Sequence, residues 1–99
     1  MCDFQIITHI ARYSLDWSGV YQESGTYGWR VDYDERDGPL EGEELSRNLA
    51  LTIVLDVAKR LIGLDCVDDS IIDRHMSKTD DDTYVAGNIR VILTDITTA

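Results

Sequence analysis

The chain has 99 residues, the size of a single domain, and contains 19 Asp and Glu against nine Lys and Arg, a formal net charge of −10. No stretch of it is basic. This excludes a direct binder of duplex DNA or RNA, because such proteins cluster Lys and Arg against the phosphates. The negative field suits a partner with a basic protein surface, including a protein that itself binds nucleic acid. Solubility or a high-salt habitat would explain the same charge without any partner.

Compartment signals agree with one another. The N-terminal residues MCDFQIITHI have no basic segment before their apolar side chains, so they do not resemble a secretory signal. The longest apolar run, LALTIVL at 49–55, is too short to span a bilayer. Cys2 and Cys66 are too few for a disulfide framework and are expected to be free thiols. These features predict a cytoplasmic protein with no membrane partner.

Two stretches in the first third of the chain predict β-strands. Residues 4–13 are rich in β-branched side chains, although a helix also fits their spacing. In residues 26–34 the large aromatic and apolar side chains alternate with glycine and charged residues, which is typical of a strand with one buried face. The ESG sequence at 23–25 predicts a turn that pairs this strand with residues 18–22. Residues 34–42 are expected to form a polar loop.

Residues 43–62 predict one long core helix. Glu43 and Glu44 at its start and basic residues at its end suit the helix dipole. Gly63 predicts a left-handed stop, with Leu64 folding back on the last turn. The apolar side chains recur at helical spacing and form a stripe that we expect to be buried: Leu45, Leu49, Ala50, Ile53, Val54, Val57, Ala58, Leu61 and Ile62.

The C-terminal third is expected to return to strand. Residues 88–97 predict a central strand buried on both faces, because apolar side chains occupy both of its alternating sets. The acidic run Asp80, Asp81, Asp82 is expected to form a turn that feeds this strand. Together these elements predict an α+β fold, a single domain over residues 1–99 in which an antiparallel β-sheet packs against one long α-helix.

The sequence contains none of the common nucleotide-binding, hydrolase or metalloprotease motifs. Cys2, His9, Cys66 and His75 are residue types that bind zinc, but they do not form two closely spaced pairs. The run at 80–82 lacks the alternating acids, the Gly and the late Glu of a calcium loop. We therefore expect no metal, no cofactor and no catalytic residues.

Residues 70–92 resemble a known family. SIIDR at 70–74, followed by YVAGNIRVI at 84–92, resembles the signature of phage-type HNH endonuclease proteins. The matching positions are Asp73, Arg74, Tyr84, Gly87 and Asn88. The resemblance implies a hairpin and a helix that clasp one metal ion, and an activity that cuts DNA.

Two departures separate the chain from that family. The acidic run at 80–82 lengthens the interval before the tyrosine. Leu93, Thr94 and Thr97 stand where the family commonly places His or Asn ligands. A metal nuclease needs a general base beside a bound ion, and a second metal ligand is not evident, so we do not expect the nuclease activity.

Three hypotheses from different classes follow. The first is a small acidic protein-binding inhibitor, in its sharpest form a phage or mobile-element protein that blocks a nucleic-acid-binding surface, as anti-CRISPR and anti-restriction proteins do. The second is a degenerate or minimal HNH-type nuclease. The third is a structural or oligomerising domain, whose sign would be an exposed apolar patch.

For the first hypothesis, carboxylates held on a strand and turn would imitate the spacing of phosphates for Arg and Lys. The residues expected to bind the partner lie in the two densest acidic turns: Asp80, Asp81, Asp82, Asp34, Glu35 and Asp37.

The charge distribution generates a first prediction. The protein should not shift duplex DNA or RNA in a gel at low salt, because it cannot neutralise phosphates. Sub-micromolar binding in that assay would contradict this interpretation of the charge.

Overall fold

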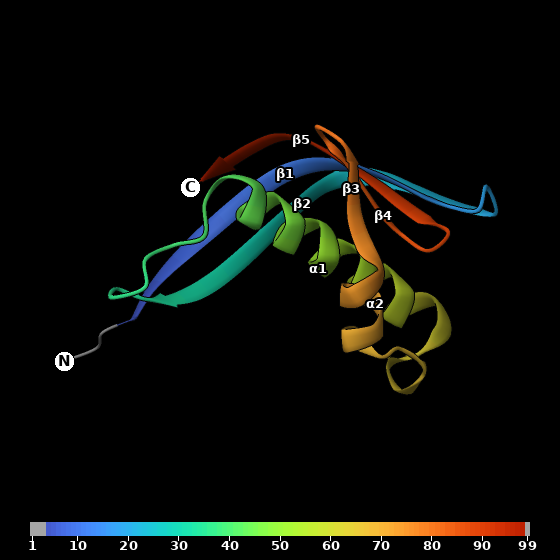
Figure 1. Ribbon diagram of the computed structural model, residues 1–99, viewed down its shortest axis with the longest axis horizontal. Helices are drawn as coiled ribbons and strands as arrows, with labels where there is room; N and C mark the ends of the chain where they lie inside the picture. Colours follow the sequence, from blue (N-terminus) through green and yellow to red (C-terminus); the bar gives the residue numbers. More distant parts are fainter. Residues whose placement is uncertain (1–3, 99) are drawn as a thin grey trace.

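The computed structural model describes residues 4–98 (Figure 1). Two long strands open the chain, a long helix follows, and three strands close it. The elements in order are β1 (Phe4–Trp17), β2 (Tyr21–Asp34), α1 (Gly42–Ile62), the 3₁₀ turn η1 (Leu64–Cys66), α2 (Asp69–His75), β3 (Met76–Asp80), β4 (Thr83–Ala86) and β5 (Ile89–Thr98).

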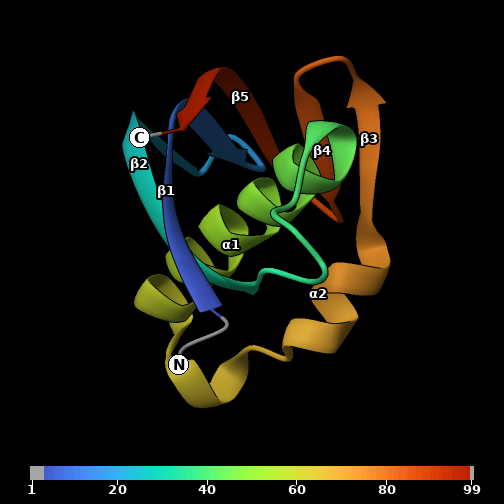
Figure 2. The same cartoon turned by 90° about the vertical axis from the view of Figure 1, so that its left-hand side faces the viewer.

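The five strands form one antiparallel sheet in the order β2-β1-β5-β4-β3. The sheet is strongly twisted, and α1 lies against one of its faces (Figures 1 and 2). The α+β class, the antiparallel sheet and the long helix are therefore confirmed. β5 occupies the centre of the sheet, as the sequence predicts.

Only one face of the sheet is covered. On β1, His9, Ala11 and Leu15 are buried toward α1, whereas Ile6, Ile10 and the other residues of even number lie on the open face. Across the hairpin the helix-facing residues pair with one another, as in His9 with Trp29. The alternation predicted for residues 26–34 is thus the period-2 pattern of a half-covered strand.

β5 obeys the same rule, so the prediction that both of its faces are buried is wrong. Ile89, Val91 and Leu93 pack under α1, while Arg90 and Ile92 face outward and are exposed. Strands buried on both faces need a second covering layer. In the described part of the chain both helices lie on one side of the sheet, and the outward set of β5 stays in water.

The turn of the first hairpin is also not where the sequence placed it. The chain reverses at Ser18 and Gly19, whose φ angles are +54° and +71°, and Val20 N donates to Trp17 O at 3.0 Å. Positive φ at both central positions matches the twist of the flanking strands. Gly25 instead lies inside β2 opposite Tyr13, where a Cβ would lie 3.8 Å from the Tyr13 ring.

Helix α1 confirms the predicted apolar stripe over its middle turns. Gly63 ends it with φ +101°, and its N–H donates to Lys59 O. The end of the stripe is not buried, because Leu61 and Ile62 are about half exposed, and Leu64 is 74% exposed rather than folded back. The buried helix residues are Leu49, Ala50, Ile53, Val54, Val57 and Ala58.

The short helix α2 was missed from the sequence. Asp68 caps it by accepting a hydrogen bond from Ser70 N at 3.0 Å. The acidic turn that follows links β3 to β4, the outer hairpin, and so does not feed the central strand directly as predicted. Four residues of β4 and the Gly87–Asn88 turn intervene before β5.

One polar cluster ties the first hairpin to α1. The Glu23 carboxylate accepts hydrogen bonds from the hydroxyls of Tyr13 and Tyr21, and Arg60 of α1 donates two more at 2.9 and 3.0 Å. Arg60 and the two hydroxyls hold the pKa of Glu23 at about 2, below its ordinary 4.5. Burial, together with the hydrogen bond to Glu23, raises the pKa of Tyr13 to about 12.

This cluster predicts how stability depends on pH. Because the folded-state pKa of Glu23 is depressed, its contribution should be complete above about pH 4.5 and lost as the pH falls toward about 2. Tyr13 is stabilised as the neutral phenol, so its contribution should be lost as the pH rises from 10 toward about 12. Glu23→Gln should lower the free energy of unfolding by about 1–2 kcal/mol near pH 7, since the carboxylate is partly solvated.

Denaturant unfolding at several pH values measures both effects. Glu35→Gln is the matched control, because this exposed carboxylate accepts one hydrogen bond from Gln5 of β1, and no hydrogen bond or ion pair of the described residues joins it to a helix. Equal stability of the two variants near pH 7 would show that the Glu23 cluster adds nothing to the free energy of unfolding.

Candidate functional site

The first predicted partner-binding turn, Asp80–Asp82, is exposed and held in place. Asp81 N donates to the Asp80 carboxylate at 2.8 Å, and Asp82 O accepts from Leu93 N of β5 at 2.8 Å. Lys78, two residues earlier, instead lies 3.9 Å from Glu43 at the start of α1. The turn therefore presents its carboxylates to solvent on a defined backbone.

The second predicted turn follows β2. Arg36 pairs with Asp34 at 2.8 Å, and these contacts lower the pKa of Asp34. Glu35 accepts from Gln5 Nε2 at 2.6 Å. Because β2 and β3 are opposite edges of the sheet, this turn and Asp80–Asp82 lie apart, and the structure does not bring them together.

Much of the negative charge has no internal partner. Seven of the nine Lys and Arg lie within 4.0 Å of a carboxylate. Within residues 4–98, ten carboxylates have no Lys or Arg at that distance, so the field they set up extends into solvent. They are Asp32, Glu35, Asp37, Glu41, Glu44, Asp65, Asp68, Asp80, Asp81 and Asp82.

The residues of zinc-binding type are scattered. His9 lies in β1, Cys66 is exposed in η1, and His75 ends α2 with its Nδ1 2.8 Å from Ile71 O. Cys2 lies outside the described residues. Among residues 4–98 no three His, Cys, Asp or Glu side chains come together as a set that could hold a metal ion.

The residues that resemble the HNH signature make contacts of other kinds. Asp73 Oδ1 accepts from Arg47 at 2.7 Å, and the same guanidinium donates to Asp73 O. Tyr84 is 1% exposed, with its hydroxyl 2.7 Å from Ser46 Oγ. These contacts join α1 to α2 and to β4, and the expectation that the chain lacks this nuclease activity stays a prediction.

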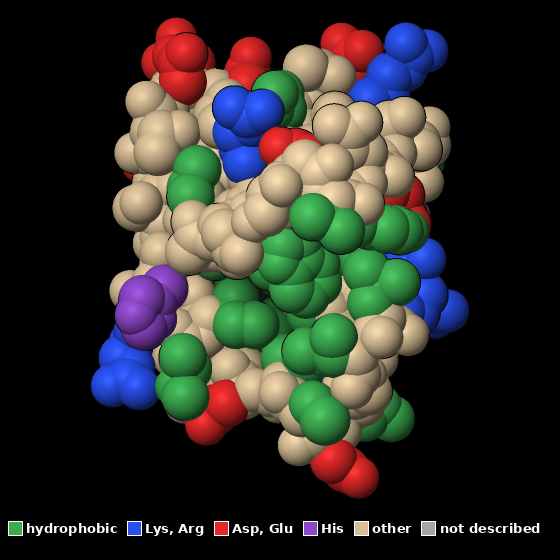
Figure 3. Space-filling view, turned by 90° about the vertical axis from the view of Figure 1, so that its right-hand side faces the viewer, with side chains coloured by type: hydrophobic (Ala, Val, Ile, Leu, Met, Phe, Trp, Pro, Cys, Tyr) green, Lys and Arg blue, Asp and Glu red, His purple; other side chains and the backbone are tan. Residues whose placement is uncertain are grey.

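An apolar surface gathers at the end of the molecule where the first hairpin turns. Two shallow hollows there share Trp17 and Ile62, and Val20 beside them is 90% exposed. Figure 3 shows hydrophobic side chains grouped over this end, with charged groups toward the margins. We call the group the end patch: Trp17, Val20, Tyr21, Leu61, Ile62, Val67 and Ile71.

The end patch was missed because the sequence signal looks like core. Leu61 and Ile62 continue the buried stripe of α1, and nothing in the sequence shows that the strands no longer cover the helix at these residues. Val20 sits in a turn, where an apolar side chain is uncommon. The apolar residue in that turn was therefore the signal in the sequence that could have indicated the end patch.

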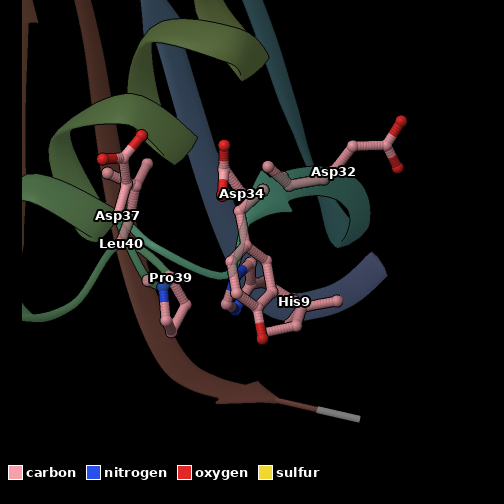
Figure 4. A pocket seen from close by; sticks show the side chains of 10 residues that line it. His9, Asp32, Asp34, Asp37, Pro39 and Leu40 are labelled. Carbon is pink, nitrogen blue, oxygen red and sulfur yellow. The ribbon is translucent and has the colours of Figure 1, made fainter. Parts of the chain in front are cut away.

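A cavity of about 470 Å³ lies at the opposite end, where β1 and β2 extend beyond the start of α1. Figure 4 shows Asp37, Pro39 and Leu40 of the loop on one side, and His9 with Asp34 on the strand side. The Asp32 carboxylate points away from the loop. Ile7, Val31, Tyr33 and Gly38 complete the lining.

Comparison with known protein families, curated proteins and solved structures finds no match to this chain. In the described part of the chain, neither helix has the length and apolar character needed to cross a bilayer.

The end patch predicts that the folded protein binds an apolar dye. Anilinonaphthalene sulfonate should bind, and replacing Val20 and Leu61 together by Ser should reduce its fluorescence, because both side chains line one hollow. Val20→Ser alone should change the free energy of unfolding by no more than about 0.5 kcal/mol, since that side chain is exposed.

The matched control replaces Ile6 and Ile10 by Ser. These isoleucines are 54% and 36% exposed on the open face of the sheet, away from the end patch. An equal loss of dye fluorescence in both double variants would show that the end patch is not a distinct apolar surface.

Proposed function

We propose that this protein acts by binding another protein, with the end patch as the anchor and the unpaired carboxylates as an electrostatic guide. The observation that carries the proposal is the end patch itself. Exposed apolar side chains that are grouped on a surface are typical of sites of protein interaction. Trp17 and Tyr21 supply the large amphipathic rings that are enriched at binding hot spots.

Charge determines which partner fits. Two copies of this chain, each with a formal charge of −10, repel one another, whereas a basic surface is attracted from a distance. Carboxylates need not touch the partner to raise the association rate. The partner we propose therefore has an apolar spot surrounded by Lys and Arg.

A basic surface of this kind is typical of proteins that bind nucleic acid. In its sharpest form the proposal is an inhibitor that occupies such a surface, as small acidic anti-CRISPR and anti-restriction proteins do. The size of the chain and the ten unpaired carboxylates support this form. It requires no catalytic residues and no cofactor.

A second candidate is favoured by the same patch. If two end patches pair, the protein is an oligomerising domain, and the charge repulsion must be overcome by apolar burial. Sedimentation of the free protein separates the two proposals. A protein that is monomeric at all concentrations supports the first proposal. A protein that dimerises, and whose Val20→Ser, Leu61→Ser variant is monomeric, supports the second proposal and contradicts the first.

The binding proposal predicts different kinetic effects for the two features. Against a partner captured from host lysate and then purified, the Val20→Ser, Leu61→Ser variant should dissociate about tenfold faster or more, because it lacks the anchor. Replacing Asp80, Asp81 and Asp82 by Asn should slow association and flatten its salt dependence, with little change in dissociation.

Surface binding measured at two salt concentrations gives both rates. The Ile6→Ser, Ile10→Ser variant is again the control and should bind as the unmodified protein does. Unchanged dissociation of the Val20→Ser, Leu61→Ser variant would remove the end patch as the anchor. Unchanged association of the Asn variant would leave Asp80–Asp82 as a solvated turn with no role in binding.

A further inference from the structure

The cavity at the far end of the hairpin holds an unusual histidine. His9 is 3% exposed and is the one charged or polar side chain among the described residues that is buried. Its Nδ1 lies 3.2 Å from Thr98 Oγ1, and its ring lies against Trp29 with the ring centroids 5.9 Å apart. The ring is thus fixed in place by β2 and β5.

The second nitrogen of this ring is open to the cavity. Within residues 4–98, Nε2 of His9 has no hydrogen-bond partner, yet no buried side-chain nitrogen or oxygen there is without one. Nε2 is therefore not fully buried, and His9 is one of the residues that line the cavity. In the tautomer that carries its proton on Nδ1, this nitrogen donates to Thr98 Oγ1 and Nε2 presents a lone pair that can accept a hydrogen bond.

The lining of the cavity includes acidic residues, and one of them pairs with a guanidinium of this chain. Asp37 has no Lys or Arg of the described chain within 4.0 Å. Beside it, the guanidinium of Arg36 contacts both oxygens of Asp34, at 2.8 and 3.3 Å. The Arg36 side chain is 82% exposed and is not among the residues that line the cavity, so it does not fill it.

We propose that this cavity binds a guanidinium group on an apolar stem, as in an arginine side chain or a small alkyl guanidine. The lining of the cavity offers groups that suit such a ligand: the Asp37 carboxylate and His9 Nε2 as hydrogen-bond acceptors, the Tyr33 ring as an aromatic face, and Pro39 and Leu40 as apolar contacts for the stem. A planar guanidinium combines multiple donors with weak hydration and stacks on aromatic rings, whereas a lysine ammonium is compact and strongly hydrated.

This site is separate from the one proposed above. The cavity lies at the open end of the first hairpin, near the pair Ile7 and Val31, whereas the end patch lies at its turn, near the pair Trp17 and Tyr21. Its test needs no protein partner. If the cavity does not bind a guanidinium, the proposal for the end patch is unaffected, and the reverse also holds.

The test is a titration followed by the NMR signals of the His9 imidazole and the Trp29 indole. N-acetyl-arginine N-methylamide and agmatine are the probes, and N-acetyl-citrulline N-methylamide is the neutral control of the same shape. We expect saturable shifts at His9, Trp29 and the amides of residues 37–40 with the guanidinium probes. Tighter binding of the capped arginine indicates a protein side chain as the natural ligand, and tighter binding of agmatine indicates a small guanidine.

Two variants make the test specific. Asp37→Asn should weaken binding about tenfold, because it removes a charge-assisted hydrogen bond at an exposed position where folding is unaffected. Asp81→Asn carries the same charge change at the opposite edge of the sheet and should bind as the unmodified protein does. Equal shifts with the citrulline control, equal weakening in both variants, or no saturable shift would each overturn the proposal.

Discussion

The structure depends on one constraint, which is that a single helix covers one face of a sheet much longer than itself. Helix α1 has 21 residues and spans about 31 Å, whereas each 14-residue strand of the first hairpin spans about 46 Å. The helix therefore buries the residues that face it on β1 from His9 to Leu15, and Ala11 and Leu15 are 1% exposed. Both ends of the hairpin extend past the fully buried part of α1, and each end carries one of the two surfaces described above.

The two ends of the first hairpin differ because different segments of the chain pack against them. At the turn of the hairpin, the last residues of α1 and the segment through α2 approach but leave Val20 and Leu61 in contact with water. At the open end, the loop from Asp34 to Glu41 crosses the gap before α1 begins, as Figure 2 shows from that side. A loop has few side chains to pack, so a cavity remains beneath it, with His9 on the strand side.

The sequence predicted the helices and strands whose residue pattern is local. It did not predict the surfaces, because these depend on where one element ends relative to another. Period-2 alternation in residues 26–34 and the helical stripe after Glu43 are properties of neighbouring residues, and both were confirmed. Whether Leu61 is buried depends on the length of strands 40 residues away, which no local pattern contains. The same limit applies to His9, whose position in a strand could be predicted but whose cavity is formed by the loop at 37–40. The predicted position of the hairpin turn was wrong for another reason. Ser18–Gly19 and Glu23–Gly25 are both acceptable turn sequences, and only the register between β1 and β2 distinguishes them.

The ion pairs that attach α1 to the other elements also explain how such an acidic chain keeps its fold. The cations are used where elements meet, since Arg60 joins α1 to the hairpin, Arg47 joins α1 to α2, and Lys78 joins β3 to the start of α1. Each of these pairs links segments far apart in sequence, which favours the folded state over alternatives with the same secondary structure. The carboxylates left over lie mainly in turns and at helix ends, where repulsion is screened by solvent and strains no packed contact. Cations placed at these contacts therefore hold the helix to the sheet, and the unpaired carboxylates leave a negative field in the surrounding solvent.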